Sequence, residues 1–351
     1  MSDFLKVGSR DYPIDSRRIG RRFSYKMHGR ISGPVYAVYY PVLAAVGVPV
    51  NVLAIVILSR GKCGLSRCIT RYLVSMAVTD LLVVISAVIF NRIIGIYFPI
   101  SFMSLTPACT LSTVIIYAVT ESSVWLTVAF TFDRFVAISC PKLKTNYCTE
   151  RRAAVVIGTI CVLSCLKSVP WYFIYEPLYT INNVPWFCNI VSSYYTSVAW
   201  TIYDWFARIL NPGLPFVFIF LLNGLTVRHI LVANKARGRL RASSNGKNES
   251  DPETESRRKS IILLFAISGS FILLWMTYVV NFLYVQISNE PYFSGSNFND
   301  PRFIRQESGN MLQLLSCCTN TCIYVATQRK FREELKSAAK YIGSQITALV
   351  K

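Results

Sequence analysis

Charge is scarce in this sequence. Only 16% of its 351 residues are charged, whereas 53% are hydrophobic and the mean hydropathy is +0.40. A soluble domain usually carries about 25% charged residues, so the composition favours a membrane protein. Acidic residues are the rarer sign, since 18 Asp and Glu stand against 37 Lys and Arg and leave a formal net charge of +19.

Histidine is almost absent. The two copies, His28 and His229, are far apart in the chain and show neither metal-ligand spacing nor a nucleophile motif nearby. We therefore expect no enzyme activity. Residues 1–33 also lack the apolar core of a cleavable signal peptide, and their basic composition predicts a disordered tail.

Long apolar windows dominate the rest of the chain. Each is long enough to cross a bilayer, and in lipid the backbone must satisfy its own hydrogen bonds, so each predicts an α-helix. The expected fold is an all-α membrane protein, a seven-transmembrane helix bundle. The windows are approximately Pro34–Leu58, Tyr72–Ile94, Pro107–Phe132, Ala153–Ile174, Ser197–Val227, Ile261–Ile287 and the most polar one, Asn310–Ala326.

The distribution of the basic residues predicts how the bundle is oriented across the membrane. The loops near residues 59–71, 135–152 and 228–260, together with the tail after residue 327, hold 23 of the 37 Lys and Arg. These segments are therefore predicted to be cytoplasmic, and the N-terminus extracellular at the plasma membrane. The eight basic residues within 1–33 do not follow this rule. The positive charge then faces anionic lipid rather than nucleic acid.

Three regions follow from this organisation. Residues 1–33 are the extracellular tail, residues 34–327 are the membrane domain, and the polar loop 235–259 within it is expected to be flexible. Residues 328–351 hold apolar side chains at helical spacing between Lys and Arg, which predicts a short amphipathic eighth helix on the inner leaflet and a cytoplasmic tail.

Cysteine usage points to one disulfide. Of the 11 cysteines, only Cys109 and Cys188 fall on the outer side, so these two are expected to pair. Cys109 lies near the start of the third window and Arg134 just beyond its end, about 37 Å further along a helix. That length spans a hydrocarbon core of about 30 Å and leaves Glu121 near its centre.

Several polar side chains fall inside the windows at similar depth. Asn51, Asp80 and Asn320 lie seven or eight residues from the inner ends of their helices, with Ser123 slightly higher. A carboxylate inside a membrane usually marks a functional site, so a hydrated pocket holding a sodium ion is one interpretation. A hydrogen bond between helices with no ion is the other.

A second group of charges lies in the outer half. Glu121, Lys167, Asp204 and Arg208 are each too costly to leave unpaired in the bilayer. We expect Glu121 to pair with Arg208 or with Lys167 beneath an outer cavity. In the alternative, Arg208 pairs with Asp204 one turn away and Lys167 extends toward the interface.

The order of these residues resembles the rhodopsin-like (class A) G-protein-coupled receptors along residues 34–342. Within that family, Ser123-Val-Trp-Leu-Thr-Val is most similar to the orphan group of G-protein-coupled receptors 139 and 142. The positions that carry the resemblance are Asn51, Asp80, Cys109, Asp133-Arg134-Phe135, Cys188, Pro215, Phe271, Trp275, Asn320-Thr-Cys-Ile-Tyr324 and Phe331.

The resemblance implies a mechanism. Asp133 would hold Arg134 at rest and release it to a heterotrimeric G protein, while Tyr324 swings inward. Trp275 would form the floor of the ligand cavity with Phe271 below it. Arrestin and a receptor kinase are further implied partners. The implied sodium site consists of Asp80, Ser123 and Asn320, and no other cofactor is expected.

Some positions depart from the family pattern. Thr277 and Thr321 stand where the family has the prolines that kink the sixth and seventh helices. Arg257 occupies the foot of the sixth window, where the family has an acid that pairs with Arg134. A binding-only receptor with weak coupling is therefore kept as an alternative. A seven-span transporter or channel is another, because Glu121, Lys167 and Arg208 would line a path through the membrane.

The predicted ligand cavity combines aromatic rings with basic and amide groups. It favours a small aromatic or acidic molecule, or a short peptide. Its residues are Tyr117, Glu121, Arg208, Tyr278, Phe282, Asn281, Asn310 and Arg92.

Overall fold

The computed structural model describes residues 4–7, 10–13, 34–242, 252–288 and 300–350. Most of the tail 1–33 and the centre of the loop 235–259 lie outside these residues, so the predictions made for them are not tested there.

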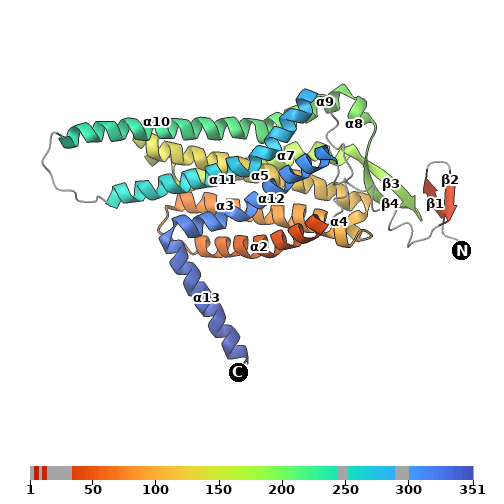
Figure 1. Ribbon diagram of the computed structural model, residues 1–351, viewed down its shortest axis with the longest axis horizontal. Helices are drawn as coiled ribbons and strands as arrows, with labels where there is room; N and C mark the ends of the chain where they lie inside the picture. The colour runs from red at the N-terminus through yellow and green to blue at the C-terminus, as the bar shows by residue number, and fades with distance from the viewer. Residues whose placement is uncertain (1–3, 8–9, 14–33, 243–251, 289–299, 351) are drawn as a thin grey trace.

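Seven long helices lie side by side and form a bundle (Figure 1). This arrangement confirms the predicted all-α seven-helix fold. In chain order the seven are α2 (Pro34–Ser59), α3 (Arg67–Val83) continued by η1 (Val84–Ile93) and α4 (Ile94–Tyr97), α5 (Thr106–Ser139), α7 (Glu150–Ser168) continued by η3 (Val169–Ile174), α9 (Val198–Arg208) continued through η4 (Ile209–Gly213) into α10 (Leu214–Ala242), α11 (Pro252–Ser288) and α12 (Pro301–Thr327).

Six of these helices, among the described residues, are long and apolar enough to cross a membrane. The exception is α12, whose sequence is interrupted by polar side chains such as Gln313 and Asn320. Those side chains face neighbouring helices rather than lipid where their contacts are known, since Asn320 donates to Asp80 on α3. The lower hydropathy of α12 thus reflects a helix that carries polar contacts inside the bundle.

Polar caps start three of the helices. The side chains of Ser66, Thr149 and Asp300 accept hydrogen bonds from the backbone N–H groups of Ile69, Arg152 and Arg302. These bonds satisfy donors that the first turn of a helix leaves open. At Asp300 the bond from the Arg302 N–H lowers the pKa of the carboxyl group.

Helix α5 runs through the middle of the bundle and contacts α3, α7, α10 and α11. Buried side chains occur along the whole length of α5, from Thr106 to Ile138. The apolar core is thickest near Arg134, where Phe130 packs with Tyr72 and Tyr324. We refer to the end of the bundle that holds Cys109 and Cys188 as the disulfide end, and to the opposite end as the Arg134 end.

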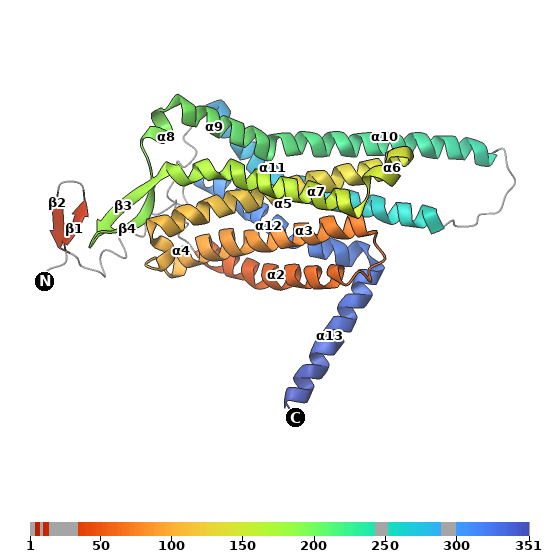
Figure 2. The same ribbon diagram turned by 180° about the vertical axis from the view of Figure 1, so that it is seen from behind.

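A β-hairpin lies over the disulfide end (Figure 2). Strands β3 (Tyr175–Ile181) and β4 (Val184–Ile190) pair antiparallel across a two-residue turn, Asn182-Asn183. Both turn residues have positive φ, 49° and 61°, which asparagine tolerates better than most residues. Cys188 on β4 forms the predicted disulfide with Cys109, and their Cα atoms are 6.5 Å apart.

The tail differs from the prediction of disorder at two segments. Strands β1 (Phe4–Val7) and β2 (Arg10–Pro13) form a second hairpin, and β1 pairs with β3 through Lys6 and Thr180. The resulting strand order is β2-β1-β3-β4. The prediction was wrong there because the open edge of β3 offers backbone hydrogen bonds that composition alone does not reveal.

The polar loop 235–259 is also shorter than predicted. Helices α10 and α11 extend past the other helices at the Arg134 end (Figure 1), and only residues 243–251 between them lie outside the described chain. The Arg, Lys, Leu and Ala residues in these extensions have high helix propensity, which explains why helix replaces loop. The predicted eighth helix is α13 (Arg329–Val350), which leaves the bundle at an angle (Figure 2). Between α5 and α7 lies a short helix, α6 (Pro141–Tyr147).

Candidate functional site

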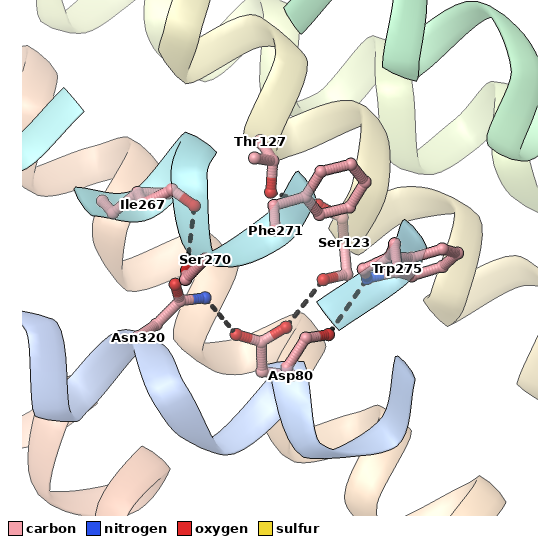
Figure 3. A pocket seen from close by; sticks show the side chains of 9 residues that line it. Asp80, Ser123, Thr127, Ile267, Ser270, Phe271, Trp275 and Asn320 are labelled. Atoms are coloured by element: carbon pink, nitrogen blue, oxygen red, sulfur yellow. Dashed lines mark hydrogen bonds between the residues drawn. The ribbon is translucent and has the colours of Figure 1, made fainter. Parts of the chain in front are cut away.

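A small cavity lies in the middle of the bundle (Figure 3). Its volume is about 20 Å³, which is enough for a water molecule or a small ion. Oxygen atoms from four helices converge on it. The lining residues are Asp80, Ser123, Thr127, Ile267, Ser270, Phe271, Trp275, Ser316 and Asn320.

Asp80 is the centre of this cavity and is 1% exposed. One carboxylate oxygen accepts from Ser123 Oγ at 2.6 Å, and the other accepts from Asn320 Nδ2 at 2.8 Å. Asp80, Ser123 and Asn320, the three residues of the site that the resemblance implied, therefore lie together (Figure 3). Asn51 lies apart from them, because its Nδ2 donates to the carbonyl oxygens of Gly47 and Cys317.

The aromatic side of the cavity belongs to α11. Trp275 Nε1 donates to Ser316 Oγ on α12 at 3.1 Å, and the Trp275 ring lies 5.2 Å from that of Phe271. Phe271 in turn contacts Phe216 on α10, with ring centroids 5.6 Å apart. Trp275 and Phe271 therefore line the cavity around Asp80, and they join α10, α11 and α12.

The Arg134 end carries a buried ion pair. Arg134 donates to Asp133 through Nε and Nη2, and its Nη1 donates to Ser260 Oγ on α11 at 3.3 Å. Asp133 and Arg134 are 1% and 5% exposed, whereas the neighbouring Phe135 is half-buried. The pairing expected from the resemblance is present, and a serine from α11 replaces the missing acid.

Two further predicted switch residues lie nearby. Tyr324 is buried against Phe331, with ring centroids 5.8 Å apart, and its hydroxyl has no hydrogen-bond partner in the described chain. Pro215 is buried at the start of α10, just after the distorted segment η4. In η4 the backbone of Asn211 leaves the helical region, with φ −153° and ψ 110°.

In the outer half, the structure combines parts of both charge-pairing hypotheses. Lys167 Nζ lies 2.7 Å from Glu121 Oε1, as one of them expected. Arg208 Nε lies 2.5 Å from Asp204 Oδ2, as the alternative expected. Arg208 also stands over the ring of Phe282 at 5.8 Å. The expected Glu121–Arg208 pair is thus not formed, because each charge has a nearer partner.

The remaining predicted cavity residues also have partners. Tyr117 stacks on Trp171 beneath the hairpin at 4.6 Å, and Tyr278 meets the edge of Trp275. Asn281 accepts from Arg305 at 2.7 Å. These contacts join different pairs of helices. None of the eight predicted cavity side chains lines the described cavity around Asp80.

Arg92 and Asn310 meet at a residue that the sequence did not single out. Glu307 accepts from Asn310 Nδ2 at 3.0 Å and lies 3.7 Å from Arg92 Nη2. Glu307 was missed because the seventh window was taken to begin at Asn310, whereas α12 begins at Pro301. Ser316 was also missed, although it lies one turn before Asn320 and so shares its face.

The side chains around the cavity determine which metal ion it could bind. Within the described chain, no three His, Cys, Asp or Glu side chains are grouped so that they could hold a metal ion. The cavity around Asp80 offers one carboxylate together with hydroxyl and amide oxygens, which are hard ligands. Such a set fits a monovalent hard cation such as sodium and not a transition metal.

Together these features define a seven-helix membrane receptor: a hairpin tied by a disulfide over one end of the bundle, a polar cavity at mid-depth and a buried Asp-Arg pair at the other end. The sequence profile of the 7 transmembrane receptor (rhodopsin family) matches residues 50–324. The chain therefore belongs to the rhodopsin family of seven-transmembrane receptors and is not an enzyme.

Individual relatives are distant. The Tachykinin-like peptides receptor 86C of Drosophila melanogaster is 26% identical over 233 residues, which cover 64% of this chain and 44% of that receptor. The C5a anaphylatoxin chemotactic receptor 1 of Oncorhynchus mykiss is 26% identical over 89% of this chain and 83% of its own length. The cysteinyl leukotriene receptor 1 of Sus scrofa is 23% identical over 80% of this chain and 77% of its own.

Proposed function

We propose that this protein carries a ligand signal across the plasma membrane to a heterotrimeric G protein. The single observation that best supports the proposal is the Asp133–Arg134 pair, which is buried at the Arg134 end and contacts α11 through Ser260. An arginine held between two helices is a switch that a partner entering between them can open. Arrestin and a receptor kinase are proposed as partners of the same face.

The proposed orientation places the N-terminus and the hairpin outside the cell. A disulfide between Cys109 and Cys188 suits the oxidising exterior, and the basic loops suit the cytoplasmic leaflet. The Arg134 end then faces the G protein.

For the ligand we propose a small aromatic or acidic molecule or a short peptide. Arg92 and Arg208 supply positive charge at the disulfide end, and Tyr117 and Phe282 supply aromatic surface. The names of two relatives refer to peptides and to leukotrienes, which are consistent with either class. Membership of the orphan group 139 and 142 stays a proposal that rests on Ser123-Val-Trp-Leu-Thr-Val.

The coupling proposal is tested by comparing wild type with Arg134→Ala in transfected cells. We expect a basal or ligand-evoked second-messenger signal that Arg134→Ala removes at equal surface expression. Arg152→Ala is the matched control, because Arg152 is an arginine at the same end of the bundle whose side chain is exposed. A signal that survives Arg134→Ala, or a current or substrate flux in its place, would contradict coupling through this residue.

We also propose that sodium binds beside Asp80. Ser123, Thr127 and Asn320 would supply oxygen ligands, and the ion would neutralise the buried carboxylate. Purified receptor should then unfold at a higher temperature in NaCl than in choline chloride at the same ionic strength. Asp80→Asn should abolish that difference, whereas Asp204→Asn should retain it. Equal unfolding temperatures of the wild type in the two salts would exclude the site.

A further inference from the structure

Arg134 uses only part of its hydrogen-bonding capacity on Asp133. Its Nε and Nη2 face the carboxylate on its own helix, and Nη1 faces the Ser260 hydroxyl of α11 at 3.3 Å. A neutral hydroxyl is a weaker partner for a guanidinium than an anion is, because an anion adds a direct charge–charge attraction and offers more acceptor sites. The hydrogen bond between Arg134 and Ser260 therefore holds α5 and α11 together less strongly than a bond from Arg134 to an anion would.

The three residues immediately before Ser260 are basic. The sequence reads Arg257-Arg258-Lys259-Ser260, and Arg258 and Lys259 are exposed. Protein kinases choose substrates partly by such charge patterns. The first turns of α11 project beyond the bundle (Figure 1), where a soluble enzyme can reach them.

We propose that Ser260 is a phosphorylation site for a kinase that selects basic sequences, and that its phosphate binds Arg134 and fastens α11 to α5. In the reaction, Ser260 Oγ attacks the γ-phosphorus of ATP. The new O–P bond forms as the bond to ADP breaks, and the hydroxyl proton passes to the base of the kinase. The product carries about −1.5 to −2 charges and three acceptor oxygens.

The geometry allows this bond without loss of the existing one. Nη1 carries two N–H groups, so it can donate to the phosphate while Nε and Nη2 stay with Asp133. The guanidinium then lies between the two anions and separates them. The phosphate would supply a negative charge beside Arg134, since Arg257 occupies the place where the family has an acid.

Because Ser260 is half-buried, its phosphorylation depends on the position of the foot of α11. In the structure its hydroxyl faces Arg134, so the kinase gains access when the foot of α11 moves away from α5. Phosphorylation then follows opening and favours reclosure. The inference rests on the proposed coupling role of Arg134, because a locked Arg134 is withheld from the G protein.

The test uses the purified full chain in detergent micelles with ATP and the catalytic subunit of cAMP-dependent protein kinase. We expect mass spectrometry to find phosphate on Ser260, and the unfolding temperature to rise by about 3 °C or more. A variant with Arg257→Ala and Arg258→Ala should keep Ser260 but lose the phosphate. In Arg134→Gln the phosphate should still attach, with no rise in unfolding temperature.

Ser260→Glu gives a second measurement that needs no kinase. It should raise the unfolding temperature relative to Ser256→Glu, which adds the same charge one turn earlier, and Arg134→Gln should remove the gain. Absence of phosphate at Ser260, or a gain that persists in Arg134→Gln, would overturn the proposal. Because these readouts measure stability and not signalling, they remain valid even if Arg134→Ala shows that the chain does not couple.

Discussion

The ion pair between Glu121 and Lys167 predicts how single and double substitutions differ. Lys167 Nζ lies 2.7 Å from Glu121 Oε1 and 3.4 Å from the carbonyl oxygen of Ala207, and the two side chains are only 13% and 8% exposed. Lys167→Met leaves a buried carboxylate without its cation, which should cost about 3–5 kcal/mol. Glu121→Gln leaves the ammonium group unpaired and should cost a similar amount.

The double substitution should be milder than either single one. With both charges removed, nothing ionised remains buried, so the coupling energy of the cycle should be about 3 kcal/mol or more, which is at least the cost of one single substitution. Thermal unfolding in detergent micelles and surface expression measure the effect. Exchanging the charges, with Glu121→Lys and Lys167→Glu, should recover part of the loss.

A matched control is the exposed pair Arg329–Glu333 on α13, whose side chains are 82% and 58% exposed. Its cycle should show coupling of no more than about 0.5 kcal/mol. If the Glu121 and Lys167 substitutions add without coupling, the pair does not stabilise the bundle and the reasoning from burial is refuted.

Two other predictions concern packing and pH. A Cβ atom at Gly309 would lie 3.0 Å from Tyr278 Cα, so Gly309→Ala should destabilise by about 1–3 kcal/mol, whereas Gly224→Ala, with nothing within 4 Å, should be neutral or stabilising in the same thermal assay. Arg71, 2.7 Å from Glu150, lowers the pKa of that carboxyl below 4.5. Any stability from this pair is therefore present above about pH 4.5 and is lost as the pH falls through the lowered value. The difference in unfolding temperature between wild type and Glu150→Gln should be constant from neutral pH to about pH 5 and shrink below it, and a difference that grew on acidification would contradict the assignment.

The depth of a polar side chain along the membrane normal could be predicted from the sequence. These depths indicated where the central cavity lies. Counting residues from the inner ends placed Asp80 and Asn320 at one level with Ser123 close above, and their side chains meet there. Each helix window was also correct to within three residues at one end, because long apolar runs have no other stable structure in lipid, whereas the fifth, sixth and seventh helices extend nine or more residues beyond the other end of the window.

The direction in which each side chain points from its helix axis could not be predicted from the sequence in the same way. Glu121 and Arg208 lie at compatible depths, yet Lys167 is the cation that faces Glu121. Two π-helical segments, η1 and η4, add to the difficulty, since an extra residue per turn rotates everything beyond it. Arg92 lies within η1, so its contact with Glu307 could not be derived from an ideal helix.

Neither α11 nor α12 has a proline beyond its first residue, and this bears on how these helices can move. Both are continuous, and they meet closely where Gly309 brings α12 against the backbone of Tyr278. Thr321, in place of a kink-forming proline, donates to the carbonyl oxygen of Val50 and ties α12 to α2. No proline interrupts the middle of α11, so we expect the helix to move as one rod that pivots near Tyr278.

The lever arms of such a rod are unequal. Ser260 is 18 residues from Tyr278, about 27 Å along the helix, so a rotation of about 10° would move it by about 5 Å away from Arg134. Asn281 lies only about 5 Å beyond the pivot, on the other side, and would shift by less than about 1 Å toward the opposite direction. Its bond from Arg305 can therefore persist through the movement, and a small displacement at the disulfide end is enough to separate Ser260 from Arg134.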